Sequence, residues 1–331
     1  MSRPLVSTII PTFDRRDEVI GSVRSAIEQT YPADALEIIV VDDGSTDGTE
    51  EALARTFGNR IRYLGKPNGG VSSARNVGLA AARGHYLALL DSDDEWHPTK
   101  IEKQVSWLEA HPAFGMVITH VGCVGADRKI YEVYDRRIQI PEDGFVLRHV
   151  LRNPALVPPS VMFVRRVYED VGGFDETLRT AEDLEFHLRV AARWPIGVLE
   201  EVLTLALRRD DGLSGLAQSY RDAITVIERF LADHADSIDP ADADAALVSA
   251  YAHNIRGLVW AGEVGEALRC GLRGMTRART LEDTRKVVGM SAALVHGLAA
   301  RMRSHVKHAL RRPGERLRTA SSTRRDERAP G

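Results

Sequence analysis

The residues best suited to chemistry lie in a short acidic run, Asp91-Ser92-Asp93-Asp94, which directly follows Leu89 and Leu90. Three carboxylates this close repel one another unless a cation or hydrogen-bond donors neutralise them. An all-oxygen cluster suits Mg²⁺ or Mn²⁺, which bind one or two carboxylates and keep coordination sites for phosphate oxygens. A solvated acidic turn is the alternative, but the apolar strand that leads straight into the cluster favours a metal site.

Two further polar clusters follow apolar segments near the N-terminus. Thr12 and Asp14 lie in PTFD, after the first segment, and DDGSTDGT follows the second segment at residues 42–49. Asp43 stands where a carboxylate can bind a base or a ribose. For Asp47 and Thr49 we favour a helix N-cap, because short polar side chains commonly satisfy the first N–H groups of a helix.

A loop with two adjacent glycines, NGGVSSARNVG, occupies residues 68–78. Gly69 and Gly70 precede a predicted helix, whose free N–H groups can receive an anionic ligand. The loop matches neither GxGxxG nor the phosphate-binding GxxxxGK[ST] pattern. A plain loop in front of a capped helix therefore stays open as the alternative.

The last cluster, TAEDLEF at residues 180–186, contains Glu182 and Asp183. A carboxylate near the acidic run could act as a general base toward a hydroxyl group. Asp183 also opens a predicted helix, so capping is the alternative, and the sequence alone does not choose.

The elements that must position these clusters alternate between strand and helix patterns. Such alternation implies a parallel sheet with helices on its faces, and ligands of such sheets bind beyond the carboxyl ends of the strands. The polar clusters lie at those ends. Apolar runs predict strands at residues 6–10, 37–41, 61–64 and 85–90, and helical spacing predicts helices at 19–31, 49–57 and 71–83.

The pattern changes along the rest of the chain. A helix is expected at 98–110, strands at 115–123 and 161–164, and a helix at 183–193. From about residue 217 helical spacing recurs, at 219–234, 241–259 and 263–275. We expect an α/β domain at 1–215, a helical C-terminal region at 216–311 and a basic, disordered tail at 312–331.

The composition excludes several classes of protein. The 331 residues are 44% hydrophobic and 27% charged, which is ordinary for a soluble globular protein. Cys123 and Cys270 form no CxxC pair, so neither a disulfide framework nor a zinc site is indicated. The longest weakly apolar stretch, 287–300, has 14 residues, whereas a membrane span needs about 20. We expect a cytoplasmic protein without a signal peptide or membrane span.

The net charge of −3 conceals an asymmetry. Residues 301–331 carry ten Lys or Arg against three acidic residues, a net charge of +7, which leaves −10 to residues 1–300. A nucleic-acid-binding protein is therefore not expected. The basic tail is either a solvated end or a contact to anionic lipid headgroups on the inner face of the membrane.

In this order, the motifs resemble those of the family 2 glycosyltransferases. The matching segments are VSTIIPTFDR, IIVVDDGSTDGT, NGGVSSARNVGL, ALLDSDDEW and GGFDE…AEDLEFHLRV, which span residues 5 to about 210. The resemblance implies a GT-A-type fold, with a Rossmann-like mixed sheet flanked by helices, and a nucleotide-sugar donor. Thr12, Asp14 and Asp43 would line the base and ribose pocket, and Gly70 and Arg75 would lie along the nucleotide.

The resemblance also implies the chemical roles. Asp91 and Asp93 would form the DxD motif, with Asp91 near the ribose and Asp93 on a divalent metal, Mn²⁺ or Mg²⁺. Asp183 would be the catalytic base, and Glu182 would help position acceptor or sugar. An acceptor hydroxyl that attacks the anomeric carbon from the opposite face would invert that centre.

Two departures from the family pattern bear on activity. Family members often carry a downstream histidine, and here Asp210 stands at that position, where it could bind metal but adds negative charge beside a diphosphate. Arg208 and Arg209 could offset that charge. Processive synthases carry QxxRW and membrane helices, whereas VAARW at 190–194 lacks the glutamine, so transfer of a single sugar is expected.

We therefore expect a metal-dependent, inverting transferase that moves one sugar from a UDP or dTDP donor. The acceptor would be a hydroxyl on a glycan, a lipid-linked intermediate or a small metabolite, as in polysaccharide biosynthesis. A sugar-nucleotide nucleotidyltransferase would carry a glycine-rich loop with a lysine near the first strand, which PTFDRRDE does not provide. A degenerate nucleotide-binding module, inactivated through Asp210, is the third alternative; Asp91, Asp93 and Asp183 argue against it.

Overall fold

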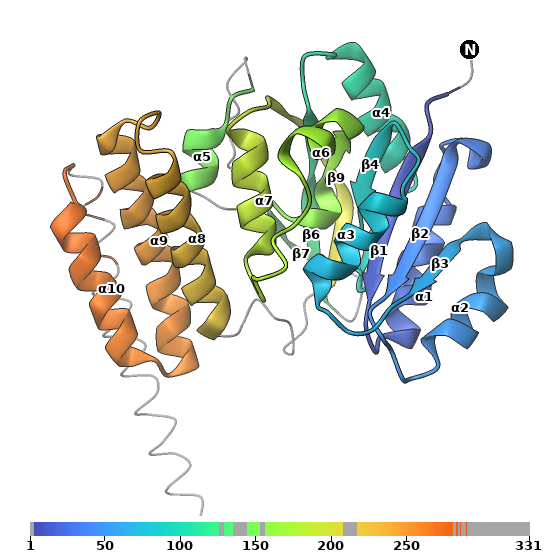
Figure 1. Ribbon diagram of the computed structural model, residues 1–331, viewed down its shortest axis with the longest axis horizontal. Coiled ribbons are helices and arrows are strands. Elements are labelled where there is room, and N and C mark those ends of the chain that lie inside the picture. The colour runs from blue at the N-terminus through green and yellow to red at the C-terminus, as the bar shows by residue number, and fades with distance from the viewer. Residues whose placement is uncertain are drawn as a thin grey trace, which may run out of the picture.

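The computed structural model describes residues 3–125, 129–134, 144–152, 156–207 and 217–280, together with Asp283, Arg285 and Gly289. Within these residues the chain forms one mixed nine-stranded sheet, helices that flank it, and a group of C-terminal helices beside it (Figure 1). This is the mixed α/β architecture that the sequence predicts.

The N-terminal half of the sheet is parallel, as the alternating pattern predicts. Its elements are β1 (Val6–Thr12), α1 (Arg16–Ile27), β2 (Leu36–Asp42), α2 (Thr49–Phe57), β3 (Arg62–Gly65), α3 (Val71–Ala81) and β4 (Tyr86–Leu89). β1 pairs with β2 and with β4, and β2 pairs with β3. Every residue of β1 is buried, because helices cover both faces of a parallel sheet. The four predicted strands and three predicted helices are confirmed to within a few residues.

The second half of the sheet contains elements that the sequence pattern did not predict. Its elements are β5 (Asp94–Trp96), α4 (Lys100–Ala110), β6 (Met116–Val124), β7 (Ile130–Tyr134), α5 (Leu147–Arg152), β8 (Met162–Val164), α6 (Arg165–Val171), α7 (Glu182–Ala191) and β9 (Ile196–Leu207). The strand order is β3-β2-β1-β4-β8-β6-β9-β5, and β7 pairs with β6 off this path. β5, β7, β9, α5 and α6 were not expected. β9 escaped prediction because Glu200 and Glu201 interrupt its apolar residues, and its register with β6 shifts between Thr119 and Val121. Short 3₁₀ turns lie at Ala33–Ala35 and Gly58–Arg60 in the first half of the chain and at Pro158–Ser160 in the second.

Helix α3 packs directly on the parallel strands. A Cβ added to Gly78 would lie 2.4 Å from Ile9 Cγ2 and 3.2 Å from Val41 Cγ2, so only glycine permits this approach. Arg75 lies one turn earlier on the same helix. The close contact therefore sets the place of Arg75 relative to the carboxyl ends of β1 and β2.

The N-termini of α1 and α2 share one carboxylate. Asp47 Oδ1 accepts hydrogen bonds from the Thr49 N–H at 3.1 Å and the Thr49 hydroxyl at 2.6 Å. Asp47 Oδ2 accepts a bond from the N–H of Arg16 at 2.9 Å. The prediction of an N-cap at Asp47 or Thr49 is wrong, because Gly48 occupies that position and Thr49 is the first residue of α2. Asp47 instead accepts the first N–H group of each helix from outside the cap position.

The C-terminal helices are α8 (Ala217–Asp233), α9 (Pro240–Ala261) and α10 (Val264–Arg277), close to the predicted ranges. α8 packs on α7 and α9 packs on α5, so these helices adjoin the α/β part (Figure 1). The Thr180 hydroxyl donates to Asp222 at 2.7 Å, and Arg229 pairs with Asp175 at 2.9 Å. Buried apolar residues of α8, α9 and α10 belong to the same hydrophobic cluster as those of the sheet.

Several predictions fall outside the described residues. The borders expected at 215/216 and 311/312, and the disorder expected of the tail, lie there. Of the helices that the structure describes, none is long and apolar enough to cross a bilayer.

Candidate functional site

Three of the predicted site residues follow strands at one edge of the sheet. Thr12 ends β1, Asp43 follows β2, and the Asp43 N–H donates to the Thr12 carbonyl at 2.9 Å. Thr12 is 3% exposed, and its hydroxyl has no hydrogen-bond partner within the described chain. Asp14 adopts a left-handed conformation, with φ of 46°, and accepts the Thr46 N–H at 2.7 Å. The ends of the parallel strands thus gather these residues where ligands of such sheets bind.

Asp43 holds the loop in front of α3. Its carboxylate accepts the N–H of Gly69 at 3.0 Å, the N–H of Gly70 at 2.7 Å and Lys66 Nζ at 2.5 Å. Gly70 has a φ of 89°, which glycine adopts without strain. The Gly70 N–H, which we expected to face an anion, therefore donates to a side chain of the protein. Direct contact of Asp43 or Gly70 with a nucleotide stays a prediction.

Arg75 joins the two acidic motifs of the sequence. Its guanidinium donates to Asp91 at 2.8 Å and to Glu182 at 2.7 Å, and its side chain is 4% exposed. Burial opposes the positive charge, but the two carboxylates raise the pKa of Arg75 above its ordinary value. The guanidinium also lies 5.1 Å from the centre of the Phe174 ring. Arg75 thus brings the DxD segment and the Glu182-Asp183 pair to one place.

The acidic run after β4 is not a solvated turn. Asp94 is 8% exposed and accepts the Leu207 N–H at 3.2 Å, and Asp93 forms an ion pair with Arg15. Burial raises the pKa of Asp93, Asp91 adds to that rise, and Arg15 opposes it. Burial, with Asp91 and Asp93, also raises the pKa of Asp94 well above its usual range. One arginine pairs with Asp93 and another with Asp91, which leaves Asp94 as the carboxyl group of the run without an arginine partner among the ion pairs of the described residues.

Asp183 lies at the start of α7, although it does not occupy the N-cap position. That position belongs to Ala181, which makes no side-chain cap and has a φ of 60°. Asp183 Oδ1 accepts the Leu184 N–H at 2.8 Å. Burial and the neighbouring charge of Glu182 raise the pKa of Asp183 to about 7. A carboxyl group with this pKa can exchange a proton near neutral pH, as a general base must.

Backbone strain is concentrated around these residues. Asp14 and Ala181 are the non-glycine residues with positive φ in the described part of the chain. One follows β1 and the other precedes the Glu182-Asp183 pair. Strained residues of this kind persist where surrounding contacts hold them, and they cluster at functional sites.

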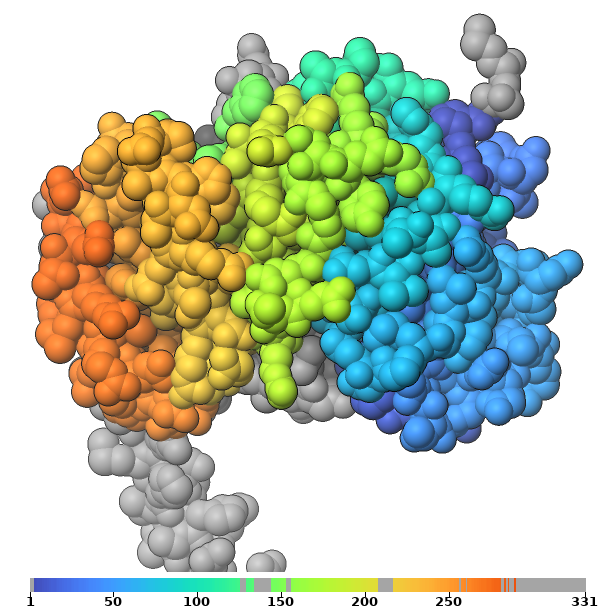
Figure 2. All heavy atoms as spheres, viewed as in Figure 1, coloured from blue at the N-terminus to red at the C-terminus, as the bar shows by residue number. Residues whose placement is uncertain are grey.

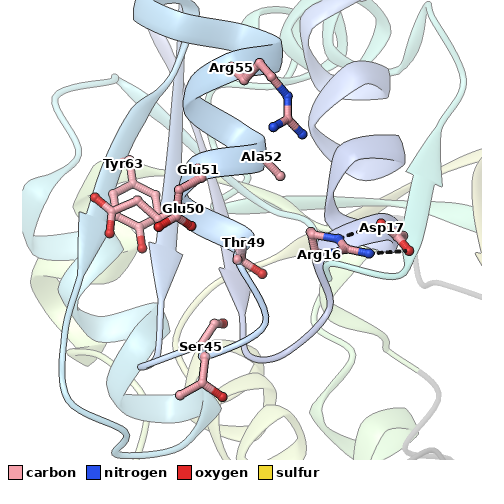
Figure 3. A pocket seen from close by; sticks show the side chains of 11 residues that line it. Arg16, Asp17, Ser45, Thr49, Glu50, Glu51, Ala52, Arg55 and Tyr63 are labelled. Atoms are coloured by element: carbon pink, nitrogen blue, oxygen red, sulfur yellow. Dashed lines mark hydrogen bonds and ion pairs between the residues drawn. The ribbon is translucent and has the colours of Figure 1, made fainter.

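An open hollow of about 750 Å³ lies beside this site rather than in it (Figure 3). Figure 3 shows the paired Arg16 and Asp17 on one side and Glu50 and Glu51 near Tyr63 on the other. The two glutamates disfavour a diphosphate. None of the predicted nucleotide-binding residues lines the hollow, although Ser45, Thr46, Gly48 and Thr49 of the DDGSTDGT motif do.

The sequence interpretation did not identify the partners of the predicted residues. Arg15 pairs with Asp93, and Lys66 pairs with Asp43. Both basic residues lie next to motifs in the sequence, in PTFDRR and KPNGG. That proximity was the available signal. The link from Arg75 to Glu182 spans 107 residues and had no local signal. Asp210 lies outside the described residues.

Comparison with solved structures supports the fold. The chain is similar to S. aureus TarS residues 1–349, whose structure was solved in complex with UDP-GlcNAc. The TM-score is 0.55 and the sequence identity is 19%, and the match covers 88% of this chain and 81% of TarS 1–349. For the mannosyltransferase PcManGT from Pyrobaculum calidifontis, in complex with GDP-Man and Mn²⁺, the TM-score is 0.56 at 22% identity, covering 90% and 87%. These likenesses identify the fold as GT-A-type.

Comparison of sequences identifies the family. An uncharacterized glycosyltransferase of Rickettsia typhi is 32% identical over 235 residues, which cover 69% of this chain and 69% of the relative. Across the Rickettsia glycosyltransferases that it matches, the chain spans from 27% to 69% of their length. The model of glycosyl transferase family 2 matches residues 7–172, half of the chain. Motifs, fold and relatives agree, and the chain belongs to glycosyl transferase family 2.

Proposed function

We propose that this chain is an inverting, metal-dependent glycosyltransferase that moves one sugar from a nucleotide-diphosphate sugar to an acceptor hydroxyl. UDP and dTDP sugars are the favoured donors. The acceptor is a glycan, a lipid-linked intermediate or a small metabolite. The observation that supports the proposal is the Arg75 bridge, in which one guanidinium contacts both Asp91, the predicted donor residue, and Glu182, the neighbour of the predicted base Asp183.

The proposed reaction is a single displacement. The acceptor hydroxyl gives its proton to the Asp183 carboxylate while its oxygen forms a bond to the anomeric carbon of the donor. The bond from that carbon to the diphosphate oxygen breaks, and its electron pair leaves with the diphosphate. Attack from the face opposite the leaving group inverts the anomeric centre, and no second, nucleophilic carboxylate is needed.

The acidic run suits a divalent cation shared with the donor. In the described residues no three acidic, histidine or cysteine side chains form a complete metal cage. Mg²⁺ and Mn²⁺ need only one or two carboxylates when phosphate oxygens complete the coordination. Burial, with the neighbouring carboxylates, raises the pKa of Asp93 and Asp94, and a bound cation would offset that effect. Asp93, assisted by Asp91, would hold the ion. When bound, it supplies positive charge that stabilises the leaving diphosphate.

The structural neighbours support a nucleotide-sugar donor. The TarS structure contains UDP-GlcNAc, and the PcManGT structure contains GDP-Man with Mn²⁺. These two donors carry different bases, so the preference of this chain for UDP or dTDP is for experiment to decide. Its cytoplasmic location, and a contact between the basic tail and the inner face of the membrane, also remain predictions.

Thermal unfolding with UDP, dTDP, GDP, CDP and ADP, each with Mn²⁺, Mg²⁺ or EDTA, tests the donor site. A nucleotide at about 100 times its dissociation constant adds roughly 2.7 kcal/mol of stability, which shifts the midpoint by several degrees. Metal-dependent stabilisation by a pyrimidine diphosphate is expected. The anomeric configuration of the product formed from the matching nucleotide sugar then tests inversion. No shift with any nucleotide and no release of diphosphate would favour the degenerate module.

A further inference from the structure

A second, smaller pocket of about 180 Å³ lies where the α/β part meets the C-terminal helices. Its walls come from α5, α7, α8 and α9, and the surfaces of α7 and α8 adjoin in Figure 2. Asp183 is one of the residues that line it. The predicted base of the reaction therefore faces a pocket that the sheet cannot form without the helical region.

His187 is the unexplained group in this pocket. It lies four residues after Asp183, hence on the same face of α7, and it is 1% exposed. Neither ring nitrogen has a hydrogen-bond partner among the described residues. Leaving a buried polar group unpaired costs about 1–3 kcal/mol, so such a group calls for a partner that binds.

The protonation state of His187 defines what it can bind. Burial, reinforced by the positive charge of Arg75, lowers the pKa of His187 to about 3. The imidazole is therefore neutral at physiological pH, with one N–H donor and one acceptor nitrogen. A hydroxyl group, which both donates and accepts, satisfies such a ring.

The opposite wall is formed by two helices that are packed against each other. Tyr220 and Ser219 come from α8, and His253 and Asn254 come from α9. A Cβ on Gly257 would lie 2.0 Å from the Tyr220 ring, so the ring rests directly on the backbone of α9. This wall carries hydroxyl, amide and imidazole groups, which are hydrogen-bonding groups without a fixed charge.

We propose that this pocket is the acceptor subsite, that it takes a neutral, hydroxyl-bearing group of monosaccharide size, and that His187 hydrogen-bonds to an acceptor hydroxyl. The inference rests on the proposed function, in which Asp183 is the base. It assigns a role to the C-terminal helices: they complete the acceptor site and determine acceptor specificity.

Size and charge both point to this ligand. A water molecule occupies about 30 Å³ of liquid, so the pocket corresponds to roughly six waters, about the volume of one sugar ring. The charged residue in its lining is Asp183, with Glu182 adjacent, and the positive charge of Arg75 is matched by Asp91 and Glu182. An anionic acceptor would meet carboxylates without a free cation among the lining residues, so a neutral one is favoured.

The test uses the full chain and separates acceptor binding from donor chemistry. Saturation-transfer NMR measures binding of methyl glucoside, methyl N-acetylglucosaminide and methyl glucuronide, the last as the anionic probe. Hydrolysis of the nucleotide sugar that wild type accepts is followed in parallel without acceptor. The variants are His187→Leu and Tyr220→Phe, with His234→Leu as the control, because His234 directly follows α8, its ring hydrogen-bonds to the Phe230 carbonyl, and it does not line the pocket.

We expect wild type to bind a neutral glycoside and not the glucuronide. His187→Leu should weaken that binding by about tenfold, the value of one to two hydrogen bonds, with donor hydrolysis retained and Tm unchanged or raised, because leucine leaves no buried polar group unpaired. Tyr220→Phe should lose less, and His234→Leu should bind like wild type. Unchanged binding in His187→Leu, preference for the glucuronide, or no glycoside binding by wild type would each overturn the inference. Failure of wild type to bind nucleotide or cleave any donor would instead overturn the proposed function, because the glycoside measurement needs no donor.

Discussion

Replacing Asp183 with asparagine should make the protein more stable at pH 8 while it abolishes transfer. The pKa of Asp183 is raised from 3.8 to about 7 by burial and by Glu182. In the unfolded chain the group ionises near 3.8, so between these values the folded state holds a proton that the unfolded state has lost. The stability contributed by Asp183 therefore falls as pH rises from about 4 to about 7.

The size of the effect follows from the shift. A change of one pKa unit corresponds to about 1.36 kcal/mol, and a shift of about three units gives an upper limit of about 4 kcal/mol above pH 7. Asparagine carries no charge, and its Oδ1 can still accept the 2.8 Å bond from the Leu184 N–H. The variant should thus gain up to about 4 kcal/mol at pH 8 and little at pH 4.

Urea unfolding of both proteins at pH 4, 6 and 8, followed by tryptophan fluorescence, measures this difference. Asp17→Asn is the matched control, because Asp17 is an exposed carboxylate whose pKa is lowered by a hydrogen bond from Arg16. Transfer by Asp183→Asn should fall by about 10²–10⁴-fold, the usual contribution of a general base. Nucleotide binding should persist, since the proposed function assigns Asp183 to the acceptor proton and not to the nucleotide.

Two results would refute the reasoning. A variant that is equally or less stable at pH 8 would show that the Asp183 carboxylate is not held in an unfavourable environment. A variant that transfers sugar at the wild-type rate would show that another group takes the acceptor proton. Loss of transfer together with increased stability at pH 8 is the combination expected of a carboxylate retained for function.

Three further predictions concern the charges around the site. Arg75→Met should destabilise the fold by about 3–5 kcal/mol in urea unfolding, because it leaves the buried Glu182 and the partly exposed Asp91 without their cation, and Arg75→Lys should lose less. The kcat/KM of wild type should fall about tenfold per unit below pH 7, as the raised pKa of Asp183 requires; a flat profile down to pH 5 would exclude Asp183 as the base. Lys100 is fully buried against the Trp96 ring, and burial lowers its pKa. The unfolded chain therefore holds a proton that folded Lys100 loses, so the free energy of unfolding of wild type relative to Lys100→Met should rise between pH 7 and 10. A difference that stays constant with pH would contradict this.

Local patterns in the sequence were sufficient for the parallel half of the sheet. The strands β1, β2, β3 and β4 are short apolar runs bounded by polar residues, and the helices between them have clear periodicity. The carboxyl ends of parallel strands share one edge, so motifs after each strand had to meet there. The bond from the Thr49 N–H to Asp47 acts within two residues and was accessible to local reasoning, whereas the bond from the Arg16 N–H spans 31 residues and was not.

The strands β5 and β9 were not predictable in this way. β5 has three residues, beginning at Asp94, and its pairing with the end of β9 bridges more than a hundred residues. β5 is an edge strand, β9 lies between β6 and β5, and both carry polar residues and depend on these neighbours for hydrogen bonds. Their propensity is therefore set by context rather than by composition.

The sequence by itself determined the family, the order of the motifs and the residue types available for chemistry. Only the tertiary structure decided which charges meet: Arg75 binds Asp91 and Glu182, the Asp43 carboxylate is engaged by its own loop, and His187 is buried without a partner beside Asp183. Electrostatic interactions and desolvation depend on distances and burial in three dimensions. No spacing along the chain encodes them, so the pKa of the base and the shape of the pocket it faces are properties of the fold.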